Sequence, residues 1–195
     1  MDTTYPKRTI ANVYLPRSAV NTVLLMVGFA VLTALAAQLR FHIPGTPVPV
    51  TGQTFAVLLS GAALGSRAGA GSQAIYWLMG AVGLPVFAQQ AGGWEAATGA
   101  TFGYLFGFVV AAWVVGALAE QGRDRTVAQA IPAFLVGNLI IYAFGVPWLM
   151  YSVSSIDTIG AALTAGFMPF IAFDIIKVVL AGIALPLAWK MTGDR

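Results

Sequence analysis

The sequence contains no cysteine and only one histidine, His42. Disulfides, thiolate metal sites and cysteine nucleophiles are therefore excluded, and so is a metal site built from several histidines. The GxSxG, HExxH, P-loop and GxGxxG patterns do not occur in the context that their chemistry requires. We therefore predict that the chain is not an enzyme and holds no metal or cofactor. Any energy coupling must then come from partners or from gradients.

Charged residues are also scarce. They make up 9% of the 195 residues, whereas 58% are hydrophobic, and soluble domains are about one quarter charged. The net charge of +3 is small and the basic residues are scattered, which argues against nucleic-acid binding. The sequence therefore predicts an all-α integral membrane protein, embedded in a lipid bilayer as a single domain.

Long apolar runs predict six transmembrane helices in one bundle. The second run is short for a complete span, and the proline-rich stretch before it could fold back into the bundle to complete it. Residues 1–18 are expected to form a polar tail with no fold of its own, and residues 147–168 a long loop with a short surface helix. The predicted spans are about 19–39, 54–64, 68–84, 102–119, 127–146 and 169–187.

The basic residues predict the orientation of these spans. The positive-inside rule places the face with more lysine and arginine in the cytoplasm. Both termini lie on that face, so we expect a cell-membrane protein with both termini in the cytoplasm. The outward connections are long and rich in proline, glycine, amide and aromatic residues. Irregular backbone near membrane depth is expected where it lines a cavity, so a ligand should bind in the outward half. Only Arg40 lies in the outward loops and Lys177 inside the membrane, whereas the inner face carries Lys7, Arg8, Arg17, Arg67, Arg123, Arg125, Lys190 and Arg195.

Asp174 and Lys177 are the most informative residues, because both lie inside the last apolar run. Each ionisable group at membrane depth costs roughly 2.5 to 3.5 kcal/mol on insertion scales. A spacing of three places the two side chains on one helical face. The pair is either a salt bridge that locks this helix to its neighbours or part of a polar ligand pocket.

Other candidate ligand contacts come from the outward stretches. Gln89 or Gln90 could offer an amide, Phe87 and Trp94 could cover an apolar ring, and Tyr104 could offer a hydroxyl. Each has a structural alternative, such as loop hydrogen bonds or packing through small residues. Gln53 could likewise be a helix cap instead of a ligand contact.

Ala30 and Ala34 lie on one face of the first span. A small-xxx-small spacing allows another helix to approach closely. That helix could belong to this bundle or to a partner subunit.

Five motifs occur together in an order that resembles the BioY family. This family comprises the biotin-specific substrate-binding (S) components of energy-coupling-factor (ECF) vitamin transporters. The resemblance covers about residues 47–187, and the combination is specific although no single motif is. The motifs are PVPVTGQ at 47–53, LGSRAG at 64–69, GLPVFA at 83–88, GATFGYLFGF at 99–108, and PF at 169–170 followed by DIIK at 174–177.

The resemblance implies a six-helix protein that binds biotin from outside through Gln89, Asp174 and Lys177. The family often has asparagine where Gln89 stands. The resemblance also implies that Ala30 and Ala34 contact a transmembrane coupling subunit. That subunit would work with ATPase subunits, unless the chain acts alone as a homo-oligomer.

The chemistry of biotin fits these residues. Asp174 would accept from a ureido N–H and Lys177 would donate to the ureido oxygen, while Arg40 or backbone N–H groups could hold the carboxylate. Two alternatives are an S component for another vitamin, such as thiamine or riboflavin, and a structural membrane subunit without transport activity.

Overall fold

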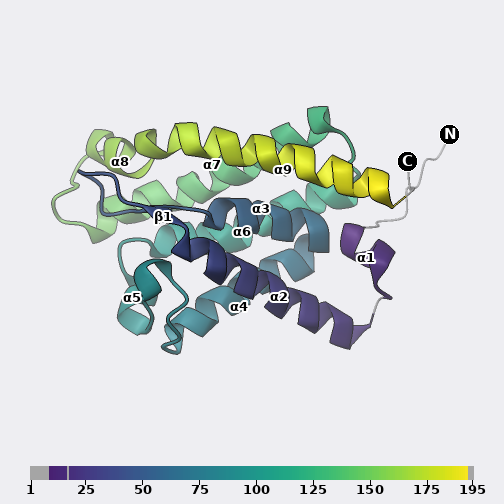
Figure 1. Cartoon of the computed structure of the whole chain (residues 1–195). Helices are drawn as coiled ribbons and strands as arrows, with labels where there is room; N and C mark the ends of the chain where they lie inside the picture. The colour runs from purple at the N-terminus through teal and green to yellow at the C-terminus, as the bar shows by residue number, and fades with distance from the viewer. Residues whose placement is uncertain (1–8, 17, 193–195) are drawn as a thin grey trace.

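The computed structural model describes residues 9–16 and 18–192, and these residues are mostly helical. Six longer helices lie alongside one another as a bundle (Figure 1). Four helical stretches are long and apolar enough to cross a membrane: α2, α6, α7 and Ile159–Met191, which includes α9. The structure therefore confirms a mostly helical chain with several helices that could cross a membrane. The longer helices are α2 (Ala19–Gln38), α3 (Gln53–Leu64), α4 (Ser66–Ala81), α6 (Phe102–Glu120), α7 (Val127–Ser152) and α9 (Ile171–Met191).

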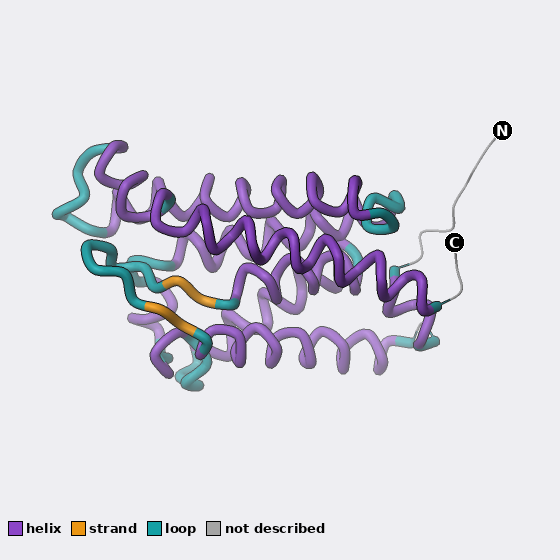
Figure 2. The backbone as a smooth tube through the Cα atoms, turned by 45° about the horizontal axis from the view of Figure 1, so that its top comes forward, coloured by secondary structure: helices purple, strands orange, loops and turns teal. Residues whose placement is uncertain are grey.

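Short elements gather mainly at one end of the bundle, which we name the hairpin end. A two-stranded antiparallel hairpin pairs Arg40 with Thr51 and Phe41 with Val50. Figures 1 and 2 place this hairpin with α5 and α8 at the same end. The elements there are β1 (Arg40–Phe41), β2 (Val50–Thr51), η1 (Ala88–Gln90), α5 (Trp94–Thr98), α8 (Ile159–Gly166) and η2 (Met168–Phe170).

The opposite end, which we name the turn end, contains the two short helix connections. Gly65 joins α3 to α4, and residues 121–126 join α6 to α7. Helix α1 (Ile10–Tyr14) and the last turn of α9 lie at this end too (Figure 1). Residues 10–14 were expected to belong to an unstructured tail, so α1 is a correction. Residues 1–8 and 17 of that tail lie outside the described residues.

Helix α7 corrects a second expectation. It continues through Pro147 to Ser152, so the connection predicted from 147 begins only at 153. A proline removes one backbone donor and usually ends a helix. In membrane helices it is tolerated because packing and neighbouring groups satisfy the freed carbonyl. Proline alone was therefore a poor signal for the end of this span.

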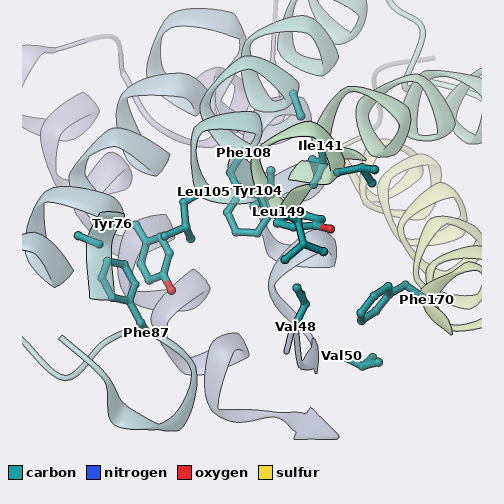
Figure 3. Close-up of a cluster of buried hydrophobic side chains, with 14 of the residues drawn as sticks. Val48, Val50, Tyr76, Phe87, Tyr104, Leu105, Phe108, Ile141, Leu149 and Phe170 are labelled. Atoms are coloured by element: carbon teal, nitrogen blue, oxygen red, sulfur yellow. The ribbon is translucent and has the colours of Figure 1, made fainter. Parts of the chain in front are cut away.

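Helix α6 lies at the centre of the bundle, against α3, α4 and α7. Close contact depends on glycine: a Cβ at Gly116 would lie 2.4 Å from the Gly65 carbonyl carbon and the Ser66 nitrogen. Two buried apolar clusters result. One, at the hairpin end, includes Tyr76, Phe87, Tyr104 and Phe170, and Figure 3 shows Tyr76 and Phe87 side by side within it. The other, towards the turn end, includes Leu58, Val115, Ala119, Phe134, Ala181 and Leu185.

Candidate functional site

A cavity of about 330 Å³ opens at the hairpin end. This volume lies within the range of small-molecule sites. Its wall combines an apolar surface with a few polar side chains, the usual composition of a site that binds a mostly apolar ligand in one orientation. Its polar side chains are Thr51, Gln53, Thr54, Gln89, Thr101, Tyr104, Tyr142, Asp174 and Lys177.

Asp174 and Lys177 form an ion pair in the wall of this cavity. Lys177 Nζ lies 2.8 Å from Asp174 Oδ1. The Lys177 side chain is 16% exposed and the Asp174 side chain 5%. One turn of α9 separates them, as the spacing of three predicts. The pair faces the protein interior, where each charge compensates the other.

Two further residues complete the pair's surroundings. Lys177 Nζ donates to Thr54 Oγ1 at 3.0 Å, and Thr54 Oγ1 donates to Asp174 Oδ1 at 3.3 Å. The Tyr142 hydroxyl donates to Asp174 Oδ2. Both carboxylate oxygens therefore have partners, drawn from α3, α7 and α9.

Thr54 and Tyr142 were missed by the sequence reasoning. Tyr142 follows Asn138 by four residues on the buried side of α7, and Thr54 directly follows Gln53. A polar residue four positions from a buried amide is a usable signal for a polar helix face. No sequence pattern, however, indicates that residues 54, 142 and 174 meet.

Gln89 lies at the exposed edge of the cavity, in an unusual backbone conformation. Gln89 has a φ of 66° and Gln90 of 57°, both in the left-handed region. Non-glycine residues rarely adopt it, and such strain tends to occur at functional sites. Among non-glycine residues, asparagine, aspartate and histidine are the ones found most often in this region. Gln89 lines the cavity and Gln90 does not.

Neighbouring helices hold this strained segment in place. Gln38 Nε2 donates to the Phe87 carbonyl at 3.0 Å, and the Tyr76 hydroxyl donates to the Val86 carbonyl at 3.3 Å. Gln53 Nε2 in turn donates to the Tyr76 hydroxyl at 2.8 Å. Gln53 thus lines the cavity and also supports the Gln89 segment.

The aromatic candidates have different positions. Phe87 and Tyr104 are buried and line the cavity. The Tyr104 hydroxyl donates to the Gly166 carbonyl at 2.8 Å, so it can offer a ligand only its acceptor lone pairs. Trp94 is 65% exposed, does not line the cavity and packs against Trp77, with ring centroids 6.0 Å apart. The expected cover by Trp94 is therefore not found.

Ala30 and Ala34 differ in how far this chain's own helices cover them. Ala30 is 0% exposed and belongs to the buried cluster at the hairpin end, and Ala34 packs against that cluster. Of the two open alternatives for this face, packing within the bundle describes Ala30 in this structure.

Comparison with known proteins identifies the family. The model of the BioY family matches residues 7–194. The chain belongs to the BioY family. A biotin transporter BioY from Thermotoga maritima is 42% identical over 153 residues, covering 78% of this chain and 88% of the relative. A BioY biotin transporter from Rhizobium etli is 33% identical, covering 79% and 84%.

The structural comparison supports the same fold. The crystal structure of an S component for biotin from an ECF-type ABC transporter superposes with a TM-score of 0.78. It covers 88% of this chain and 92% of the other at 23% identity. BioY-family membership therefore rests on sequence, and the shared bundle rests on structure.

The residues from 9 to 192, apart from 17, contain no group of three or more His, Cys, Asp or Glu side chains that could hold an ion.

Proposed function

We propose that this chain binds biotin in the cavity at the hairpin end and takes it up as the S component of an ECF-type transporter. The observation that carries the proposal is the Asp174–Lys177 pair, which faces an apolar cavity in a member of a family whose relatives are biotin transporters. A charged pair at this depth has a use if a polar heterocycle binds beside it.

The proposed binding mode uses the ureido ring of biotin at the ion pair. A ureido N–H donates to Asp174, sharing the carboxylate with Tyr142 and Thr54, and the ureido oxygen accepts from Lys177. An ammonium has three N–H groups, and Asp174 and Thr54 take two of them in this structure. Phe87, Leu105 and Phe108 supply apolar surface for the sulfur ring, and Gln89 covers it at the mouth.

We also propose that six helices span the cell membrane, with both termini in the cytoplasm. Arg67, Arg123, Arg125 and Lys190 all belong to the turn end, opposite the cavity, which supports this orientation. The cavity then opens outward. The partners proposed with it are a transmembrane coupling subunit and ATPase subunits, or further copies of this chain.

Titration calorimetry of the purified protein with biotin tests the proposal. Asp174→Asn and Lys177→Ala are each expected to weaken binding at least tenfold, because each removes a charge-assisted hydrogen bond. Matched controls are Asp157→Asn and Lys190→Ala, whose exposed side chains do not line the cavity. Unchanged affinity in both site variants would contradict the assigned site.

Competition with thiamine and riboflavin distinguishes biotin from another vitamin. A structural subunit without transport activity predicts that no vitamin binds or raises the melting temperature. Uptake of labelled biotin into cells, with and without coexpressed coupling and ATPase subunits, decides which partners are needed.

A further inference from the structure

One wall of the cavity is a short irregular stretch of chain. The stretch comprises residues 94–101, of which only 94–98 are helical, as α5. It lines the cavity with Ala96, Gly99, Ala100 and Thr101. A five-residue helix has too few internal hydrogen bonds to hold itself. The position of this wall must therefore be set from outside the stretch.

Two tryptophans supply that support. Trp77 Nε1 on α4 donates to the Ala97 carbonyl at 3.1 Å, and Trp148 Nε1 on α7 donates to the Gly99 carbonyl at 2.9 Å. The two donors come from different helices and bind carbonyls only two residues apart. They hold the wall to the bundle at two points.

The two indoles are themselves fixed by packing. The Phe102 ring lies between them, with centroids 6.1 Å from Trp77 and 4.9 Å from Trp148. A Cβ at Gly103 would lie 2.3 Å from Trp148 Cβ, so only glycine lets α7 bring Trp148 this close. None of the rings of Trp77, Phe102 and Trp148 lines the cavity. They lie behind the wall, outside the cavity lining.

We propose that Trp77 and Trp148 are positioning residues for the ligand: their indole N–H groups hold the 96–101 wall in the conformation that binds. The inference deepens the proposed function, because it concerns the same cavity. Without the two indole donors, the Ala97 carbonyl would lose its side-chain partner, and the Gly99 carbonyl would keep only the Phe102 backbone N–H. The wall would then lose its two attachments to α4 and α7 and could move. Ligand would then leave faster, because a mobile wall no longer encloses it.

The test separates the N–H group from the ring. Trp148→Phe keeps an aromatic ring and loses the donor. Trp148→His keeps a donor, because imidazole Nε2 occupies the ring position of indole Nε1, and at about pH 8 an ordinary histidine is neutral. Trp113→Phe is the control, since Trp113 is exposed on α6 and does not line the cavity.

Two readouts are needed: biotin affinity with its dissociation rate, and amide hydrogen exchange of residues 94–101. Trp148→Phe is expected to weaken binding by up to about tenfold, mainly through faster dissociation, because it removes one part-buried hydrogen bond that holds the wall. It should also speed exchange in the wall. Trp148→His should recover most of both effects, Trp77→Phe should resemble Trp148→Phe, and Trp113→Phe should change neither.

The outcomes distinguish the two proposals. If the wild-type protein binds no biotin but Trp148→Phe still speeds exchange and Trp148→His restores it, biotin binding is wrong and the support of the wall stands. If neither phenylalanine variant changes exchange, or if the phenylalanine and histidine variants behave alike, the positioning role is overturned whatever the affinity.

Discussion

The two ends of the bundle are held together by different means. At the turn end, helices meet backbone to backbone through small residues: a Cβ at Gly61 would lie 2.5 Å from the Ala112 carbonyl oxygen. At the hairpin end, side chains on the long helices also donate to carbonyls of the loops and short helices. The donors are Gln38, Tyr76, Trp77, Tyr104 and Trp148. Close helix contact leaves no room for a ligand, whereas side-chain support of loops leaves a cavity between them.

Two acidic residues close the turn end. Glu120 Oε1 accepts from the Ser66 backbone N–H at 2.8 Å, at the start of α4. Asp124 Oδ2 accepts from Trp189 Nε1 at 2.6 Å, near the end of α9. The Arg125 guanidinium lies 3.5 Å from the centroid of the same indole. The end of α6 and the turn after it therefore bind both α4 and α9.

The largest effect is expected at the hairpin end, from Lys177→Ala in the absence of ligand. Removing the ammonium leaves a buried carboxylate without its counter-charge, which typically costs about 3–5 kcal/mol. Thermal unfolding in detergent measures the loss. The double variant Asp174→Asn/Lys177→Ala should recover much of it because the uncompensated charge is gone. A double variant less stable than Lys177→Ala would show that the pair's charge is not the cause.

Gly116→Ala is the matching change at the turn end. The added methyl group meets the backbone of Gly65 and Ser66, and overpacking of this kind costs about 1–3 kcal/mol. The melting temperature should fall while biotin affinity per folded molecule stays the same. Lower affinity in the folded fraction would mean that the two ends are coupled.

A smaller, pH-dependent effect is expected at Asp124. Burial raises the pKa of this carboxyl above its ordinary value of 3.8, against opposing effects of Trp189, a backbone hydrogen bond and Arg125. The folded state then binds the proton more tightly than the unfolded state. This group therefore stabilises the fold more as the pH falls towards 3.8, and its contribution is lost as the pH rises through the raised value. Melting temperatures at several pH values should show a shallower dependence for Asp124→Asn than for Asp157→Asn.

The smallest effect is expected from Gly28→Ala on α2. A Cβ there meets nothing within 4 Å, so alanine removes backbone freedom at no steric cost. A gain of roughly 0.5–1 kcal/mol is expected, and the comparison with Gly116→Ala isolates close packing from helix propensity. Destabilisation by Gly28→Ala would show that the bare face of α2 packs against something in the membrane.

The sequence predicted the helical membrane fold and the ion pair because both depend on local information. Apolar runs report burial in lipid, and a spacing of three on one helix fixes the relation of Asp174 to Lys177. Tyr142 and Thr54 could not be found in this way, because they reach Asp174 from α7 and α3, 32 and 120 residues away in sequence. Such contacts depend on how helices pack.

Side-chain direction was the other gap. Phe87 and Trp94 belong to the same connection between α4 and α6, yet Phe87 points into the bundle and Trp94 away from it. In irregular backbone no 3.6-residue or two-residue period says which side chain faces inward. The same reasoning failed at Pro147, where packing keeps α7 helical beyond the proline.

Tyr142, Thr54 and Lys177 give both carboxylate oxygens of Asp174 hydrogen-bond partners. This matters for how a transporter releases its ligand. If Asp174 had no partners of its own, release of the ligand would be costly, because it would leave an unpaired carboxylate in apolar surroundings. Here the vacated protein remains electrically balanced through its own hydroxyls and ammonium. Ligand binding and release then exchange one set of hydrogen bonds for a comparable set. A transporter that works repeatedly requires this.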